Sequence, residues 1–431
     1  MPLLKKLRPL LIVLLVAIAL ASIKTSASSL AVPDTYLKDF MQEYLLAKAA
    51  IAGINPYLPL PELAHRFISP PPEILLQHPT PHPPPVAVIS LPLVLLRYEQ
   101  AAAVWFGFEI GCIFVAAYLL LCGLSLRPGF LNIVTLGSLA LCWHPFWEEL
   151  VLGQINTLLL VLLLAAWIDF RSGRDARGGI WLGLIIALKV MAWPIAIFML
   201  LKQRWYALIA IALTVVGMHL VAMAVIGINY YFDYYRHLDE VMTFYRYNGW
   251  NISLWSIGYR LFEGTQGYIV TVPLFFSPFM AKAVSIALPL LLLIVALVCA
   301  LRSVKFDTAF GILVGASLLV NPVAWTHYLT LLTLPVALAV RDLLSRQRSR
   351  PQLFAATVTA LLLLVSRIHV NRFSYLAFDS SHTTENQIVG PLAGMLLLVP
   401  VYGVLGVMWC LWRWERTALS GDGAHVILKT E

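Results

Sequence analysis

The chain is built from apolar runs that recur from one end to the other, with short polar segments between them. Many of these runs have the length of about 17–25 residues that crosses a bilayer core as an α-helix. Lipid offers the backbone no hydrogen-bond partners, so spans of this kind form helices rather than open strands. The pattern predicts an all-α polytopic membrane protein in the cell membrane.

Basic residues between the runs indicate how the chain is threaded. Lys and Arg concentrate in cytoplasmic loops, so five basic clusters predict inner loops and an inner C-terminus. The clusters are Arg171, Arg174 and Arg177; Lys202 and Arg204; Arg302 and Lys305; Arg341, Arg346, Arg348 and Arg350; Arg413 and Arg416. The spans between them number about twelve, with both termini cytoplasmic. They are 7–23, 104–124, 130–147, 157–168, 178–188, 192–201, 205–226, 280–301, 307–320, 328–340, 351–368 and 388–412.

Two segments fit more than one interpretation. Basic residues, an apolar core and small residues follow one another within residues 1–27, as in a cleaved signal peptide. A retained first span fits equally, and we favour it because it holds the following polar stretch at the membrane surface. Residues 86–97 are too short to cross a bilayer easily, so we expect a re-entrant or surface helix on the outer side.

Most of the informative polar sequence falls on the predicted outer side, in loops 24–103, 227–279 and 321–327. No polar stretch is long enough for a separate soluble domain. We therefore expect one membrane module over 1–345, followed by transmembrane helices and a short inner tail over 346–431. Any chemistry belongs to the outer face.

Composition agrees with this scheme. Hydrophobic residues make up 60% of the chain and charged residues 12%. The net charge of +8 comes mostly from residues that flank spans, which argues for orientation in a membrane and against nucleic-acid binding. The five Cys lie in or beside apolar runs without CxxC spacing, which argues against a disulfide framework or a thiol nucleophile.

The densest polar stretch runs from Asp39 to Tyr57, directly after the first apolar run. Residues 39–51 are expected to form an amphipathic helix, which Asn55 and Pro56 end. Asp39 is a candidate general base at the membrane surface. The alternative is that Asp39 and Glu43 cap and solvate a surface helix. The residues alone leave both interpretations open.

Further candidates lie along the middle of the chain. His78 and His82 belong to a proline-rich segment, which predicts a rigid loop wall rather than a metal site. Gln154 and Asn156 head a Leu-rich span, where amides can bind sugar hydroxyls or phosphate oxygens, or join helices. Lys189 is costly within an apolar segment unless it has a partner, which predicts either phosphate binding or snorkelling to the interface.

Two later motifs combine aromatic and polar residues. Asn251 follows the aromatic run 230–235, a combination suited to sugar faces but also typical of an interfacial belt. Trp325, His327 and Tyr328 lie on a turn that Pro322 breaks. A histidine there can donate to a phosphate or sugar oxygen, although a single histidine is often purely structural.

The order of these motifs resembles glycosyltransferase family 87. The pattern is Asp-Phe, Gly-x-Asn-Pro-Tyr, Pro-Pro, Gly-Gln-x-Asn at a span start, Leu-Lys followed by Pro, Asn-x-Ser, and Pro-x-x-Trp-x-His-Tyr. The resemblance covers roughly residues 35–345. It implies a GT-C-type helical bundle with outer loops and short surface helices.

The resemblance also implies an inverting transfer of a hexose, in the first place mannose, from a polyprenyl-phosphate sugar to a hydroxyl of a lipid or glycan at the outer face. Asp39 would be the general base, with Asp34 as its rival. The implied substrate- and phosphate-binding residues are Gln154, Asn156, Lys189, Asn251, His327, Tyr57, Trp325 and Tyr328. No metal and no cofactor are expected, since neither an acidic metal cluster nor a nucleotide fold is visible. The absence of a Gly-rich phosphate loop argues against a nucleotide-sugar donor.

Two other functions use a similar outer groove. A transporter or flippase of a lipid-linked sugar would place polar residues on both faces and charges at mid-depth. An oligosaccharide ligase would need larger outer loops and a broader basic surface. The predicted inner side holds little except short basic loops, which disfavours a transporter or flippase.

Overall fold

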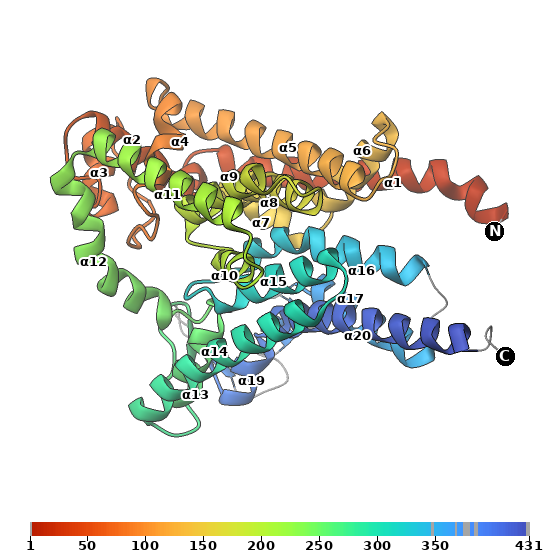
Figure 1. Ribbon diagram of the computed structural model, residues 1–431. Helices are drawn as coiled ribbons and strands as arrows, with labels where there is room; N and C mark the ends of the chain where they lie inside the picture. Colours follow the sequence, from red (N-terminus) through yellow and green to blue (C-terminus); the bar gives the residue numbers. More distant parts are fainter. Residues whose placement is uncertain (1, 346–348, 367–368, 374–379, 383–386, 428–431) are drawn as a thin grey trace. The chain divides into compact units, whose positions relative to one another are not determined.

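The computed structural model describes residues 2–345, 349–366, 369–373, 380–382 and 387–427 (Figure 1). Within these residues the chain folds almost entirely into helices. It divides into two compact units, Met1–Val190 with Tyr206–Val241, and Met191–Trp205 with Met242–Glu431. Arg346 and Arg348 of the predicted basic clusters lie outside the described residues.

The first unit holds the N-terminal helices and the whole Asp39 stretch. Its elements are α1 (Pro2–Ala27), η1 (Ser28–Leu30), η2 (Asp34–Leu37), α2 (Phe40–Ile51), α3 (Leu60–Phe67), α4 (Pro85–Ser90), η3 (Leu91–Leu95), α5 (Tyr98–Gly123), α6 (Phe130–Leu141), α7 (His144–Leu152), α8 (Asn156–Arg171), α9 (Asp175–Lys189) and α11 (Trp205–Ile226). Helix α12 (Ile228–Arg246) belongs to this unit as far as Val241. Helices α5, α8 and α9 pack in sequence, around buried residues such as Trp167 and Phe170.

The second unit is built around α15 (Phe306–Val320), which is buried from Asp307 to Val320 between α14 and α20. Its other elements are α10 (Trp193–Leu201), α13 (Leu254–Phe262), β1 (Ile269–Thr271), α14 (Pro278–Arg302), η4 (Thr326–Leu332), α16 (Thr333–Ser345), α17 (Arg350–Leu364), β2 (Ser380–His382), β3 (Gln387–Val389), α19 (Pro391–Leu396) and α20 (Val399–Ile427). The three strands form one small sheet in the order β1-β3-β2. Strand β3 runs parallel to β1, with Val270 opposite Ile388, and antiparallel to β2.

The helices confirm an all-α membrane protein. In the described residues five helices are long and apolar enough to cross a bilayer, or six if one bent pair is counted as a span. The five are Leu7–Leu30, Tyr98–Gly123, Trp205–Ile226, Pro278–Arg302 and Thr326–Ser345. Three shorter apolar helices accompany them, one of which is Pro85–Leu95 in the segment expected to be re-entrant. The number of twelve spans therefore stays a prediction.

Two predicted spans differ from the structure. The segment 130–147 is not one straight helix, because α6 ends at Leu141 and α7 starts at His144 with a bend of 78° between them. Pro145 lies in the first turn of α7, where its missing N–H costs no helical hydrogen bond. The segment 388–412 begins as strand β3, and its long helix α20 starts only at Val399.

Gly153 brings α7 close to the Asp39 stretch. It caps α7 with a φ of +69°, a left-handed conformation that favours glycine. A Cβ atom at this position would lie 2.9 Å from the Phe40 Cβ and 3.3 Å from the Lys38 Cε. Only glycine fits here without moving the segment that carries Asp39.

We predict that Gly153→Ala lowers the thermal stability of the purified protein in detergent, by about 1–3 kcal/mol from backbone strain and overlap. Gly107→Ala is the matched control, because Gly107 lies inside α5 with no atom within 4 Å of its added Cβ. A fluorescence melting curve compares the two variants. Equal melting temperatures for Gly153→Ala and the wild type would contradict the prediction.

Candidate active site

Helix α2 forms where the sequence predicts it, but it is not a solvated surface helix. Asp39 occupies the N-cap position without a side-chain capping bond, and the residues from Phe40 to Ala50 are buried apart from Lys48. The helix ends where Gly53 takes a φ of +67° and the Asn55 side chain accepts a hydrogen bond from the Tyr57 backbone. The Asp39 carboxylate is therefore available for contacts outside α2.

Lys38 fastens this stretch to the end of α7. Its Nζ donates to the backbone oxygens of Leu150 and Val151, at 2.9 and 2.5 Å, and to the Ser29 hydroxyl at 2.8 Å. The last carbonyls of a helix have no partners within it, so a buried ammonium satisfies them well. Burial lowers the pKa of Lys38 to about 8, although the charges of Glu109 and Asp39 act in the opposite direction. The bonds of Lys38 keep Asp39 beside the loop that follows α7.

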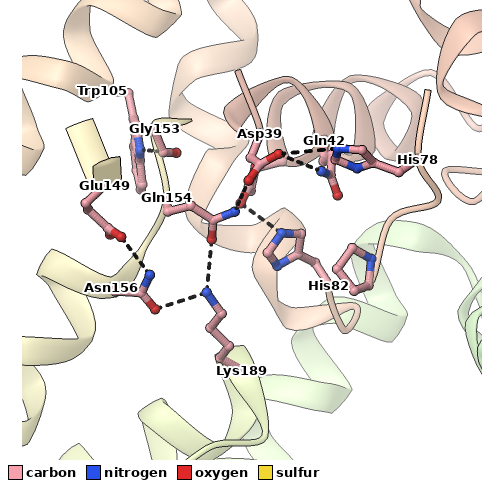
Figure 2. Close-up of polar contacts among 12 residues, drawn as sticks. Asp39, Gln42, His78, His82, Trp105, Glu149, Gly153, Gln154, Asn156 and Lys189 are labelled. Atoms are coloured by element: carbon pink, nitrogen blue, oxygen red, sulfur yellow. Dashed lines mark hydrogen bonds and ion pairs between the residues drawn. The ribbon is translucent and has the colours of Figure 1, made fainter. Parts of the chain in front are cut away.

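A chain of hydrogen bonds begins at Asp39 and ends at Glu149 (Figure 2). Gln154 Nε2 donates to Asp39 Oδ2 at 2.7 Å, and Lys189 Nζ donates to Gln154 Oε1 at 2.9 Å. Lys189 Nζ also donates to Asn156 Oδ1 at 3.0 Å, and Asn156 Nδ2 donates to Glu149 Oε2 at 2.7 Å. One ammonium therefore links two carboxylates through two amides.

Lys189 is inside the fold rather than snorkelling to an interface. It is the last residue of α9, and only 8% of it is exposed. Val190 ends the helix with a φ of +39°. The sequence prediction that this lysine needs a partner is met by the two amides, and contact with a phosphate stays a prediction.

The proline-rich segment lies against α2, as Figure 2 shows for His78 and His82. His78 Nε2 is 3.9 Å from Asp39 Oδ1, and His82 Nε2 is 3.2 Å from Glu43 Oε1. The Tyr57 hydroxyl donates to the His82 carbonyl at 3.4 Å, which ties the turn after α2 to the same segment. The predicted wall thus contacts the residue before α2, a residue within α2 and the turn after it.

Glu43 and His82 form a neutral pair. Burial raises the pKa of Glu43 well above its usual value, with the Asp39 charge adding to the increase. Burial also lowers the pKa of His82 to about 3, and the positive Lys189 adds to this decrease. Both shifts favour the uncharged forms, so the contact joins a carboxylic acid to a neutral imidazole.

The carboxylates of this cluster differ in the solvent exposure of their side chains. The side chain of Asp39 is 13% exposed, whereas that of Glu43 is 1% exposed. Glu149 is fully buried, and so is Glu109 in α5. Asp34, the rival base, is exposed at the start of η2. Within the buried network, Asp39 is the carboxylate that a substrate hydroxyl can reach.

The remaining predicted residues belong to the second unit. Asn251 donates to the backbone oxygens of Tyr245 and Pro322, and its Oδ1 accepts from the Ser253 and Ala324 backbone N–H groups. The structure therefore joins the two late motifs of the sequence. His327 and Tyr328 are buried, with ring centroids 4.9 Å apart, and Trp325 packs edge-on against Tyr245. Substrate contacts by these residues stay predictions.

Several contacts of this network are not predicted by the sequence patterns. The pairing of His82 with Glu43 and the anchoring bonds of Lys38 have no signal in spacing, because each joins segments far apart in the chain. Glu149 and Asn156 are only seven residues apart, but a turn separates their helices, so no helical periodicity pairs them. A signal did exist for Lys38 and Glu109, since charged residues are rare in so apolar a sequence. The described residues contain no group of three or more His, Cys, Asp or Glu side chains that could hold a metal ion.

The fold and the site define a helical membrane protein with one accessible carboxylate in a buried polar network. Residues 81–322 match glycosyltransferase family 87, and the chain belongs to this family. The family is one of glycosyltransferases, and the long apolar helices of this chain are those of a membrane protein. The matched residues include Gln154, Asn156, Lys189 and Asn251, whereas Asp39 precedes them.

Two curated relatives are similar to part of the chain. Both are alpha-(1->3)-arabinofuranosyltransferases of Mycobacterium tuberculosis, from strains CDC 1551 / Oshkosh and ATCC 25618 / H37Rv. Each is 29% identical over 154 residues, which are 34% of this chain and 34% of the relative. The similarity thus spans about a third of the length of each relative. No solved structure matches the chain.

The neutral state of His82 predicts a pH-dependent stability. Below pH 6.5 the unfolded chain binds a proton at His82 that the folded protein excludes, so stability falls as the pH decreases toward 3. At pH 5, keeping His82 neutral lowers the free energy of unfolding by about 2 kcal/mol, and we expect His82→Gln to abolish this loss. The exposed His65 provides the control variant His65→Gln. Melting curves from pH 5 to 7.5 that run parallel for His82→Gln and wild type would refute the neutral assignment.

Proposed function

We propose that this glycosyltransferase takes its sugar from a polyprenyl-phosphate donor and that Asp39 is the general base. The accessibility of Asp39 within an otherwise buried set of carboxylates is the observation that carries this proposal. The acceptor is a hydroxyl of a lipid or glycan at the outer face of the cell membrane, with both termini of the enzyme in the cytoplasm.

The two oxygens of Asp39 differ in their surroundings. Oδ2 accepts the short bond from Gln154, whereas Oδ1 has Gln42 at 3.4 Å and His78 at 3.9 Å. Gln154 can hold the carboxylate by Oδ2 while Oδ1 accepts a proton. This arrangement fits a base that is fixed by one short bond at Oδ2 and has only longer contacts at Oδ1.

In the proposed reaction the acceptor O–H bond breaks and its proton moves to Asp39 Oδ1. The acceptor oxygen forms a bond to the anomeric carbon from the face opposite the phosphate, and the bond from that carbon to the phosphate oxygen breaks. The electron pair of the broken bond leaves with the phosphate. Because the acceptor attacks from the opposite face, the configuration at the anomeric carbon inverts. His327 and Lys189 are the proposed groups that stabilise the charge on the departing phosphate.

Two kinds of sugar fit the proposed donor class. Resemblance to the family favours a hexose, in the first place mannose, whereas the two curated relatives are named for arabinofuranose transfer. Both sugars can be carried by the same lipid phosphate, so the donor class does not depend on the choice. Asn251, Trp325, Tyr328 and Tyr57 are the proposed contacts to sugar and acceptor, while Asn156 acts from within the network.

We predict that Asp39→Asn lowers the transfer rate by about 10²–10⁴-fold, because it removes the proton acceptor and keeps the shape. Asp34→Asn tests the rival base and is expected to keep most of the activity. Glu62→Gln is the surface control, since Glu62 forms an exposed pair with Arg66. Transfer is measured in purified protein with a polyprenyl-phosphate sugar. Full activity in Asp39→Asn, or its loss in Asp34→Asn alone, would disprove the assignment.

A donor comparison tests the substrate class. Wild-type protein is supplied in parallel with polyprenyl-phosphate mannose, polyprenyl-phosphate arabinofuranose and the corresponding nucleotide sugars, each carrying a radiolabelled glycosyl group. We expect label to reach the acceptor from one of the lipid phosphates and not from the nucleotide sugars. Direct transfer from a nucleotide sugar in the purified system would show that the donor class is wrong.

A further inference from the structure

Glu149 lies at the opposite end of the hydrogen-bonded chain from Asp39. Its Oε2 accepts from Asn156 Nδ2, and its Oε1 accepts from the Thr157 backbone N–H at 3.1 Å. None of Glu149 is exposed, so it cannot touch a substrate directly. Any influence on the reaction must pass through Asn156, Lys189 and Gln154.

The donors and acceptors in this chain determine how each amide is turned. An ammonium only donates, so Gln154 and Asn156 both direct their oxygens to Lys189. Their NH₂ groups then face outward, where each meets a carboxylate oxygen. The acceptors of Glu149 thereby help to hold Asn156, which helps to hold Lys189 in the position that orients Gln154.

Burial makes each of these bonds important. Lys189 and Asn156 are both buried, so a lost acceptor leaves a polar group that water cannot readily satisfy. Removing the Glu149 carboxylate therefore loosens the Asn156 amide, and with it the positions of Lys189 and Gln154.

We infer that Glu149 is a positioning residue that holds Gln154 against Asp39 through Asn156 and Lys189 (Figure 2). This inference rests on the proposed function, in which Asp39 takes the proton. It assigns the deepest carboxylate of the network to the reaction without placing it in contact with substrate.

Other charged and titratable groups surround the same site and remain in place in a Glu149 variant. They are Lys38 before α2, Glu43 in α2, His78 and His82 in the proline-rich segment, and Glu109 in α5. Glu43 and His82 contact each other, and Lys38 is bound to the carbonyls at the end of α7. A change at position 149 therefore isolates the acceptor group at the end of the chain.

The test is the separate measurement of kcat and KM for Glu149→Gln in the full-length protein, with polyprenyl-phosphate mannose or arabinofuranose, whichever the wild type uses. We expect kcat to fall about tenfold, because a glutamine side chain cannot accept from both Asn156 and the Thr157 backbone N–H through its single oxygen and Gln154 is then held less firmly. KM for the donor stays close to the wild-type value, because Glu149 touches no substrate. Glu62→Gln again serves as the surface control.

The double variant Glu149→Gln with Asn156→Asp restores the matching of donors and acceptors in the chain. The amide introduced at position 149 then accepts from the Thr157 backbone N–H and donates to the carboxylate introduced at position 156. The other oxygen of that carboxylate accepts from Lys189. We expect this variant to recover most of the wild-type kcat, and it carries the test if Glu149→Gln alone does not fold.

An unchanged kcat in folded Glu149→Gln, or a kcat still reduced about tenfold in the folded double variant, would overturn the inference. The activity of Asp39→Asn separates the role of Glu149 from the proposed function. If Asp39→Asn is inactive while kcat of Glu149→Gln is unchanged, only the role of Glu149 fails. If Asp39→Asn is fully active, the proposed function itself fails.

Discussion

The ammonium of Lys189 can only donate hydrogen bonds, and this restriction orders the polar centre of the first unit. Two amide oxygens turn toward it, so two amide NH₂ groups turn away from it and toward Asp39 and Glu149. Burying an ammonium is unfavourable unless such partners surround it. The same bonds that satisfy Lys189 therefore fix the carboxylate that we propose as the base.

A second buried lysine brings this centre together. Lys38 lies beside Asp39 in sequence and binds the last carbonyls of α7, so it places Asp39 next to Gln154. The left-handed turn at Gly153 allows the close approach, because a side chain there would meet Phe40 and Lys38. The position of Asp39 is thus determined by backbone contacts, while its chemistry is determined by side chains that follow in α8 and α9.

Much of the helical architecture could be predicted from the sequence, whereas the site could be predicted only in part. Hydropathy predicts the span 205–226, which coincides with α11, because a long apolar run has one simple solution in lipid. It does not detect the bend between α6 and α7, or the strand at Gln387–Val389, since apolar composition is the same in either geometry. Asp39, Gln154 and Lys189 were each candidates, but Asp39 and Gln154 are 115 residues apart and nothing in their spacing pairs them. The directions of amide oxygens and NH₂ groups depend on three-dimensional neighbours, so Glu149 could not be recognised as part of the site.

The most direct test of the central claim is an experimental structure of the Asp39→Asn variant with a polyprenyl-phosphate sugar and an acceptor bound. The account predicts the acceptor hydroxyl within hydrogen-bond reach of the position 39 side chain, about 2.6–3.2 Å, and on the face of the anomeric carbon opposite the phosphate. An acceptor hydroxyl held instead by Asp34, or a reacting carbon remote from residue 39, would contradict it.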